Sequence, residues 1–166
     1  DYAGILGYTF LSRFVTTLDY PGQSVRFSPV PPPGAKKGAG ADSVPFDLVN
    51  GAMLVKAQVN GKPVRFLFDT GSAEILILPK AAQRLGLAIS VSPDDPSVGF
   101  ARLDPLALGA AVAGALPAVV HSWPSERQIG GFEGILGYPF LSRYRVTVDY
   151  REKTITLEPG GKAAKP

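Results

Sequence analysis

The sequence contains no cysteine and only one histidine among its 166 residues. Without cysteine the protein has no disulfide framework and no thiol chemistry, although this does not fix its compartment. A lone histidine, His121, predicts no metal site, and we expect no metal and no cofactor. No apolar run approaches the ~20 residues of a membrane-spanning helix, and no segment resembles a signal peptide.

The formal net charge is +3, from 17 basic and 14 acidic residues. The excess lies outside the candidate domain: Lys36, Lys37 and Asp42 occupy a proline- and glycine-rich stretch, and Lys162 and Lys165 occupy the C-terminal end. The rest of the chain holds 13 basic and 13 acidic residues and is therefore neutral. This balance gives no support for nucleic-acid binding.

The central feature is an apolar strand that ends in an aspartate. Hydrophobic side chains occupy alternate positions over residues 64–68, so Asp69 follows a buried strand, and Gly71 allows a sharp turn. A carboxylate in such a place is costly unless it is hydrogen-bonded or used in chemistry. The hydroxyls of Thr70 and Ser72 and the nearby backbone N–H groups are available to bind it. On these residues alone, a capped turn is the simpler interpretation.

A second motif, Gly134-Ile135-Leu136-Gly137, changes that balance. Its last glycine follows Asp69 by 68 residues. The two motifs in this order resemble the signatures of the retropepsin-like aspartic proteases, and the resemblance extends over about residues 46–157. It implies an all-β fold, a retropepsin/pepsin-like closed β-barrel, with short helices after the Asp-Thr-Gly loop and after the Ile-Leu-Gly strand. We place these helices at residues 79–85, between a proline and a glycine, and near residues 139–144.

The resemblance also implies an activity, aspartic-type endopeptidase. Two carboxylates would share one proton and activate a water, one as base and one as acid. Asp69 would supply one, and a second retropepsin-like domain or a homodimer mate the other; the further partner is a peptide or protein substrate. The implied catalytic residues are Asp69, Thr70, Gly71 and Ser72; the implied substrate-binding residues are Ala73, Glu74, Val98, Gly99 and Phe100; the implied supporting residues are Ile135, Leu136 and Gly137.

Some positions depart from the retroviral pattern. Ala73 and Tyr138 stand where those proteases carry an acid and an arginine that pair, so both partners are absent together and no charge is orphaned. Glu74 keeps an acid one residue later, either as a solvated side chain or as a contact for a basic or polar substrate group. Ser72 resembles the pepsin-like version, in which a hydroxyl helps to hold the carboxylate.

A hairpin over residues 87–103, interrupted by the proline-rich residues 93–97, is expected to be the flap that closes over substrate. In that position Val98, Gly99 and Phe100 would approach the peptide, with the glycine permitting close backbone contact. An ordinary exposed hairpin is the alternative, since the segment is short for a flap.

An internal repeat defines the domain organisation. Residues 3–29 align with residues 133–159 at a constant offset, with 13 of 27 positions identical. We therefore expect residues 1–29 to be the C-terminal remnant of a preceding retropepsin-like domain, 30–44 a linker, 45–158 the complete domain and 159–166 a flexible tail. Because the sequence begins at Asp1, we expect a piece of a longer protein, and the compartment stays open.

The remnant should form a short helix near residues 9–14 and then a strand hairpin to Phe27. Its apolar side chains should pack near residues 145–157 of the complete domain; these are Ile5, Leu6, Phe10, Leu11 and Leu18. Two functions remain open at this point. The first is the dimeric or tandem protease, and the second is a non-catalytic peptide-binding or dimerisation module of the same fold.

Overall fold

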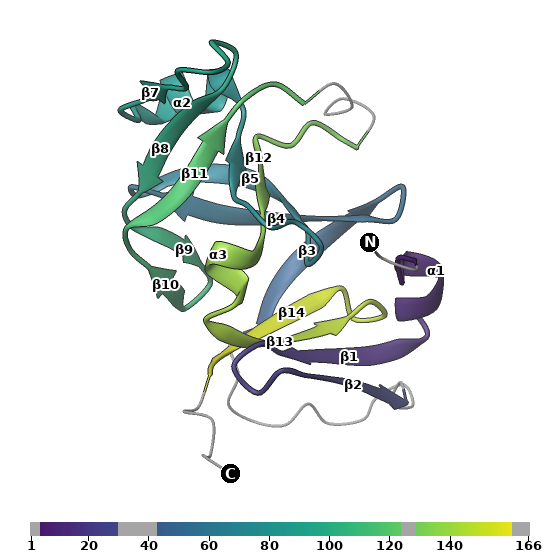
Figure 1. Cartoon of the computed structure of the whole chain (residues 1–166). Coiled ribbons are helices and arrows are strands. Elements are labelled where there is room, and N and C mark those ends of the chain that lie inside the picture. Colours follow the sequence, from purple (N-terminus) through teal and green to yellow (C-terminus); the bar gives the residue numbers. More distant parts are fainter. Residues whose placement is uncertain (1–3, 30–42, 124–128, 161–166) are drawn as a thin grey trace.

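The computed structural model describes residues 4–29, 43–123 and 129–160 (Figure 1). The N-terminal part consists of helix α1 (Tyr8–Leu11) and strands β1 (Phe14–Asp19) and β2 (Ser24–Pro29). At the C-terminal end, helix α3 (Tyr138–Leu141) and strands β13 (Tyr144–Asp149) and β14 (Thr154–Pro159) have the same order. The helix and both strands begin and end at repeat-equivalent residues, so these parts of the two copies have the same local structure, whereas residues 4–6, the equivalent of strand β12 (Gly134–Leu136), form no strand. The residues proposed as linker and tail lie mostly outside the described residues.

The barrel between these two copies is built from short strands and one helix. Its elements are β3 (Ser43–Val49), β4 (Ala52–Val59), β5 (Lys62–Phe68), β6 (Leu76–Ile77), α2 (Pro79–Leu85), β7 (Ser90–Val91), β8 (Gly99–Leu103), β9 (Leu106–Leu108), β10 (Ala111–Ala113), β11 (Leu116–Val120) and β12 (Gly134–Leu136). The predicted all-β class with two short helices after the two motifs is confirmed. Strand β3 begins at Ser43, two residues before the boundary expected from the sequence, and pairs with β14 there.

The strands of the described chain form one continuous hydrogen-bonded path. Its order is β2-β1-β13-β14-β3-β4-β5-β12-β6-β11-β8-β7, with β9 pairing to β4 and to β10. The path is open at β2 and β7, so the sheet curls into a barrel without closing as a ring of strands. Figure 1 shows β2, β1, β13 and β14 as a layer below the barrel, with β3 running between the two parts.

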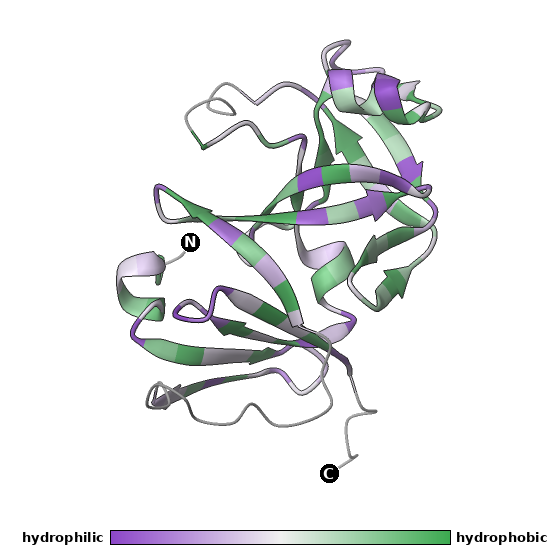
Figure 2. Cartoon of the chain, turned by 180° about the vertical axis from the view of Figure 1, so that it is seen from behind, coloured by the Kyte–Doolittle hydropathy of each residue, from purple (hydrophilic) through white to green (hydrophobic). Residues whose placement is uncertain are grey.

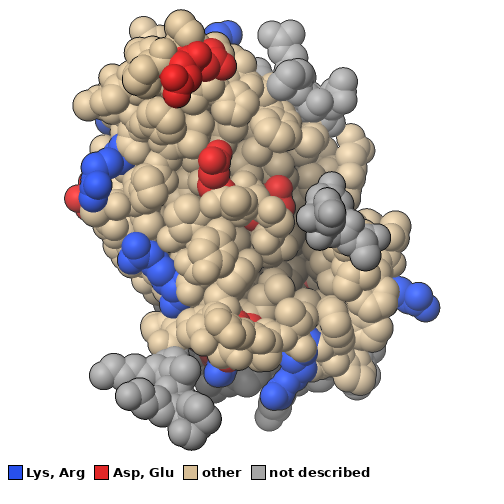
Figure 3. All heavy atoms as spheres, viewed as in Figure 1, with Lys and Arg blue, Asp and Glu red and all other residues tan. Residues whose placement is uncertain are grey.

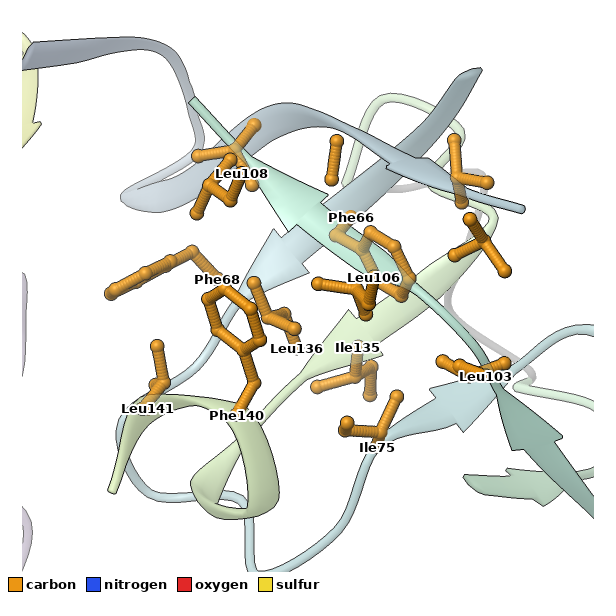
Figure 4. Packing of buried hydrophobic residues seen from close by; sticks show 14 of the residues in the cluster. Phe66, Phe68, Ile75, Leu103, Leu106, Leu108, Ile135, Leu136, Phe140 and Leu141 are labelled. Atoms are coloured by element: carbon orange, nitrogen blue, oxygen red, sulfur yellow. The ribbon is translucent and has the colours of Figure 1, made fainter. Parts of the chain in front are cut away.

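Local sequence signals account for the elements that carry the site. Asn60 and Gly61 both have positive φ, 51° and 73°, and form the tight turn between β4 and β5. Helix α2 has a proline in its first turn and ends at Gly86 in the left-handed conformation. Strand β5 alternates between buried and partly buried residues, as its pattern predicts. Figure 4 shows the core that these elements enclose, with Phe66 and Leu136 among its fully buried residues.

Strand β12 lies between β5 and β6, parallel to the former and antiparallel to the latter. The two glycines that flank Ile135 and Leu136 make this close packing sterically allowed. A Cβ on Gly134 would meet the Leu76 carbonyl oxygen, and a Cβ on Gly137 would meet the carbonyl oxygens of Ser72 and Glu74. No side chain fits at either position without moving the backbone of the neighbouring segment.

The N-terminal copy joins the C-terminal copy through its strand. β1 pairs antiparallel with β13, with Thr17 opposite Thr147. The prediction that this segment packs near residues 145–157 is therefore confirmed. Leu11 and Leu18 pack against the core as expected, but the expectation that Ile5 and Leu6 are buried is wrong. In the barrel, β5 and β6 flank the equivalent residues Ile135 and Leu136, whereas no described strand lies in the equivalent place beside Ile5 and Leu6.

The two repeat copies offer a matched test of this packing. Gly137→Ala should lower the free energy of unfolding by about 3 kcal/mol, because the new methyl group collides with backbone carbonyls. Gly7→Ala places the same methyl at the equivalent helix N-cap, where no heavy atom lies within 4 Å of it, and should change stability by less than about 1 kcal/mol. Urea denaturation of both variants measures the difference, and equal losses would contradict this account of β12.

Candidate active site

Asp69 directly follows β5, and backbone hydrogen bonds define its position. Its N–H donates to the Leu136 carbonyl oxygen at 3.1 Å, which ties the residue to β12. The N–H of Ser72 then donates to the Asp69 carbonyl oxygen at 3.3 Å and closes a tight loop. On the far side of this loop, the Tyr138 N–H donates to the Ser72 carbonyl oxygen at 2.9 Å. The Asp-Thr-Gly-Ser loop is thus held at both ends by the segment around Gly137.

The Asp69 side chain is half-buried and is oriented from within its own loop. The Gly71 N–H donates to Asp69 Oδ1 at 2.9 Å, and this is a charge-assisted bond when the carboxylate is ionised. A Cβ on Gly71 would lie 3.3 Å from the same oxygen, so a side chain at this position would crowd the carboxylate. The hydroxyl of Thr70 has no hydrogen-bond partner within the described residues.

Ser72 has a different contact from the one suggested by its resemblance to pepsin-like loops. Its Oγ donates to the Glu74 carbonyl oxygen at 3.0 Å and accepts from the Glu74 N–H at 3.4 Å. The hydroxyl therefore stabilises the backbone after the loop and does not bind the Asp69 carboxylate. The Glu74 side chain itself is exposed.

A pocket of about 270 Å³ lies beside this loop. Ala73, Glu74 and Ile75 form one wall, and Phe100 from β8 and Pro117 from β11 face them. Val98 and Gly99 do not line it. Gly99 is buried in the β7–β8 hairpin, where it packs against the side chains of Ile89 and Val120, so it is not free to approach a peptide. Of the three expected flap residues, only Phe100 is placed against this pocket.

The structure adds a tyrosine that the motifs did not point to. Tyr20, from the N-terminal copy, packs edge-on against Tyr138, with ring centroids 5.8 Å apart. Burial raises the pKa of Tyr20, and the negative charge of Asp69 and the neighbouring Tyr138 raise it further. Because the Tyr138 N–H is bonded to the Ser72 carbonyl oxygen, this ring contact places Tyr20 beside the residue that holds the Asp69 loop. The recurrence of Asp-Tyr at residues 19–20 and 149–150 was the available signal, but it did not indicate proximity to Asp69.

On the face shown in Figure 3, Lys and Arg side chains are scattered around the outline and do not gather into one patch. Among residues 4–29, 43–123 and 129–160, no group of three acidic or histidine side chains is placed to hold a metal ion. In the same residues, no helix is long and apolar enough to cross a membrane.

A barrel of short strands, with an Asp-Thr-Gly-Ser loop tied to a glycine-flanked strand, is the architecture of an aspartyl protease lobe. The family model for aspartyl proteases matches residues 55–140, about half of the chain, and the chain belongs to this family. No curated protein shows significant sequence similarity to it.

Two solved structures are similar to this chain. One is a retropepsin-like aspartic protease from Rickettsia conorii, with 19% sequence identity and a TM-score of 0.53 over 71% of this chain and 89% of that chain. Another is the retroviral protease-like domain of Ddi1 from Leishmania major, with 18% identity and a TM-score of 0.48 over 66% of this chain and 98% of that one. The first of these supports the retropepsin-like fold.

The pKa of Tyr20 provides a test of its place at the site. Asp69→Asn should lower the pKa of Tyr20 towards its ordinary value of 10.0, because one of the causes that raise it is removed. Absorbance titration of the tyrosines, with Tyr20→Phe to assign the signal, measures this shift. Because a tyrosine with a raised pKa favours the folded state only while protonated, this stabilisation should be lost as the pH rises above about 10. An unchanged titration in Asp69→Asn would contradict the placement.

Proposed function

We propose that this chain supplies one half of an aspartic endopeptidase, with Asp69 as one of two catalytic aspartates. The Asp69 loop is the observation that supports this proposal. The carboxylate is half-buried at a strand end, one of its oxygens accepts the Gly71 N–H, and β12 holds the loop from behind. The family of the chain agrees with this chemistry. A merely structural turn has no need of a partly buried carboxylate at this place.

The reaction needs a second carboxylate close to Asp69. Two such groups cannot both ionise easily, so the pair retains one proton. The ionised group takes a proton from water as the water oxygen attacks the peptide carbonyl carbon, and the protonated group donates to the carbonyl oxygen. Collapse of the tetrahedral intermediate then breaks the C–N bond: the carboxyl group that took the water proton protonates the departing amine, and the other carboxylate takes a hydroxyl proton back from the intermediate, so the pair again holds one proton. A single aspartate lacks the acid that this sequence requires.

The residues around Asp69 have roles in the same scheme. The unpartnered hydroxyl of Thr70 would bind the second Asp-Thr-Gly-type loop, and the backbone at Gly71 would contact the substrate backbone. The pocket between Ala73 and Phe100 would take an apolar substrate side chain, with Glu74 at the loop side of it. Ile135, Leu136 and Gly137 would keep the loop in position.

A second function, a non-catalytic peptide-binding module, is favoured by two observations. The edge of β13 is already paired with β1, and the described chain brings only one Asp-Thr-Gly-Ser loop. In that case the pocket would hold a peptide without cleaving it. The Asp69→Asn variant distinguishes the two functions. It should still bind peptide in both cases, and it should lose cleavage only if the chain is a protease.

Asp69→Asn should abolish cleavage of a mixed peptide library, because the amide can act neither as base nor as acid. Asp94→Asn, in an exposed loop, is the matched control and should leave cleavage unchanged. A monomer has one aspartate, so any cleavage by this chain alone requires a second copy, and activity per mole should then rise with protein concentration while dimers are sparse. Cleavage that survives in Asp69→Asn, or specific activity independent of dilution in a sample that sedimentation shows to be monomeric, would contradict the proposal.

Phe100→Ala should weaken the binding of peptides with a bulky apolar side chain by about tenfold, since it removes one wall of the pocket. Val112→Ala, at an exposed apolar residue of β10, is the control and should bind like wild type. Titration calorimetry measures both affinities without requiring turnover. Equal affinities would show that this pocket does not hold the side chain.

A further inference from the structure

The two repeat copies are related by an approximate two-fold axis through the β1–β13 ladder. Thr17 faces Thr147, its own repeat equivalent, and their hydroxyls lie 3.0 Å apart. The pairs on either side of these threonines are equivalent to each other. Val15 faces Asp149, and Asp19, the equivalent of Asp149, faces Arg145, the equivalent of Val15. The N-terminal copy thus occupies the place that the β13 edge of a symmetric partner would take.

Aromatic pairs repeat the same symmetry. Tyr20 packs edge-on against Tyr138 at 5.8 Å between ring centroids, and Tyr150 packs against Tyr8 at 5.5 Å. These are equivalent pairs, since Tyr8 corresponds to Tyr138 and Tyr20 to Tyr150. The contact between the copies is therefore reciprocal, as in an isologous interface.

Burial, by contrast, is strongly unequal between the copies. Ile135 and Leu136 are 4% and 0% exposed, whereas the identical Ile5 and Leu6 are 82% and 61% exposed. On the hairpin, Ile155 is fully buried, but its equivalent Val25 is 54% exposed. Figure 2 shows the hydrophobic residues that α1 and β1 carry in this part of the molecule. Apolar side chains that are core in one copy lack their cover in the other.

The backbone shows the same difference. In the barrel, the Leu136 carbonyl accepts from Asp69 and the Tyr138 N–H donates to Ser72. Within the described residues, the equivalent carbonyl of Leu6 and N–H of Tyr8 have no such partner. A Cβ placed on Gly4 or Gly7 would have no heavy atom within 4 Å, although their equivalents are in close contact with neighbouring backbone. The glycines leave space for two flanking strands, and none of the strands in residues 4–29, 43–123 and 129–160 fills it.

One further contact is present on one side only. The turn between β3 and β4 packs on the N-terminal copy, where Gly51 lies against the Tyr8 ring. The symmetric position, over Tyr138, is uncovered, and Tyr138 is 55% exposed. β2 likewise ends the sheet, whereas its equivalent β14 pairs with β3. A β3-like strand and its turn would satisfy both positions.

A second copy of this chain does not provide what is missing. Its own β5 and β6 already flank its own β12, so it has no pair of strands to offer. Its β13 edge is occupied by its own β1. The vacant positions require a lobe that has strands equivalent to β3, β5 and β6 but lacks a Gly-Ile-Leu-Gly strand of its own.

We infer that residues 4–29 are the docking site of such a lobe, an incomplete aspartyl protease half whose strands enclose Gly4–Gly7 and extend β2. This inference rests on the proposed function, because that lobe's own aspartate loop would sit against Gly7 and supply the second carboxylate. The active enzyme is then a two-lobed pair across the β1–β13 axis and not a homodimer of this chain.

The test places a second copy of residues 43–133, as the docking lobe, ahead of residues 4–166 of this chain. Residues 43–133 are joined directly to Gly4, because Glu133 precedes Gly134 in the barrel and the junction is therefore natural. Hydrogen exchange of the Leu6 and Tyr8 amides reports docking, and thermal unfolding of Gly7→Ala reports close packing. The unextended chain and Gly137→Ala are the matched controls.

The docked lobe should slow exchange of the Tyr8 amide at least about tenfold relative to the unextended chain. Gly7→Ala should lower Tm by about 6–9 °C in the extended chain, as Gly137→Ala does, while it changes little in the unextended one. Unchanged exchange of the Tyr8 amide, together with a Gly7→Ala substitution that leaves the Tm of the extended chain unchanged, would overturn the inference. An added copy of residues 43–133 that stays unfolded would overturn it too. A concentration-dependent dimer of the unextended chain that protects the same amides and is lost in Leu6→Asp would also overturn it.

Cleavage by the extended chain is a separate readout. Protected amides with peptide cleavage that needs both aspartates support the docking site and the protease function together. Protected amides without cleavage support the docking site but count against the protease function. Cleavage with unprotected amides supports the protease function and overturns the docking site.

Discussion

The insertion of β12 between β5 and β6 is the constraint on which the candidate site depends. The Leu136 carbonyl oxygen of β12 accepts the Asp69 N–H, and the Tyr138 N–H donates to the Ser72 carbonyl oxygen. The Asp69 loop therefore cannot shift without breaking these two hydrogen bonds. The packing is close enough to exclude a Cβ at Gly134 and at Gly137. An apolar strand that needs glycine at both ends thus determines where a carboxylate is placed.

The same short sequence occurs twice in the chain in different surroundings. In the barrel, Ile135 and Leu136 contribute to the core; in the N-terminal copy, Ile5 and Leu6 face solvent although the helix and hairpin after them have the same bounds. Local structure therefore follows from the repeated sequence, whereas burial depends on strands from elsewhere. This contrast is the reason to regard the N-terminal copy as part of a second lobe.

The site could be predicted in its main part. The strand before Asp69, the turn at Gly71 and the supporting Gly-Ile-Leu-Gly strand have strong local patterns, and so have helix α2 and the hairpin at residues 60–61. The details that could not be predicted depend on contacts distant in sequence. The Ser72 hydroxyl binds the Glu74 backbone, Gly99 is buried under Ile89, and Tyr20 packs against Tyr138, whose N–H holds the Asp69 loop.

The sequence by itself determined the class of the protein, the order of its elements and the identity of the candidate catalytic aspartate. It did so because hydrophobic alternation, turn residues and glycine positions act within a few residues. Only the tertiary structure decided which copy of the repeat is buried and which edge of the sheet is occupied. Those outcomes depend on which segments pack side by side, and the pairing of β1 with β13 across the repeat is such a long-range contact.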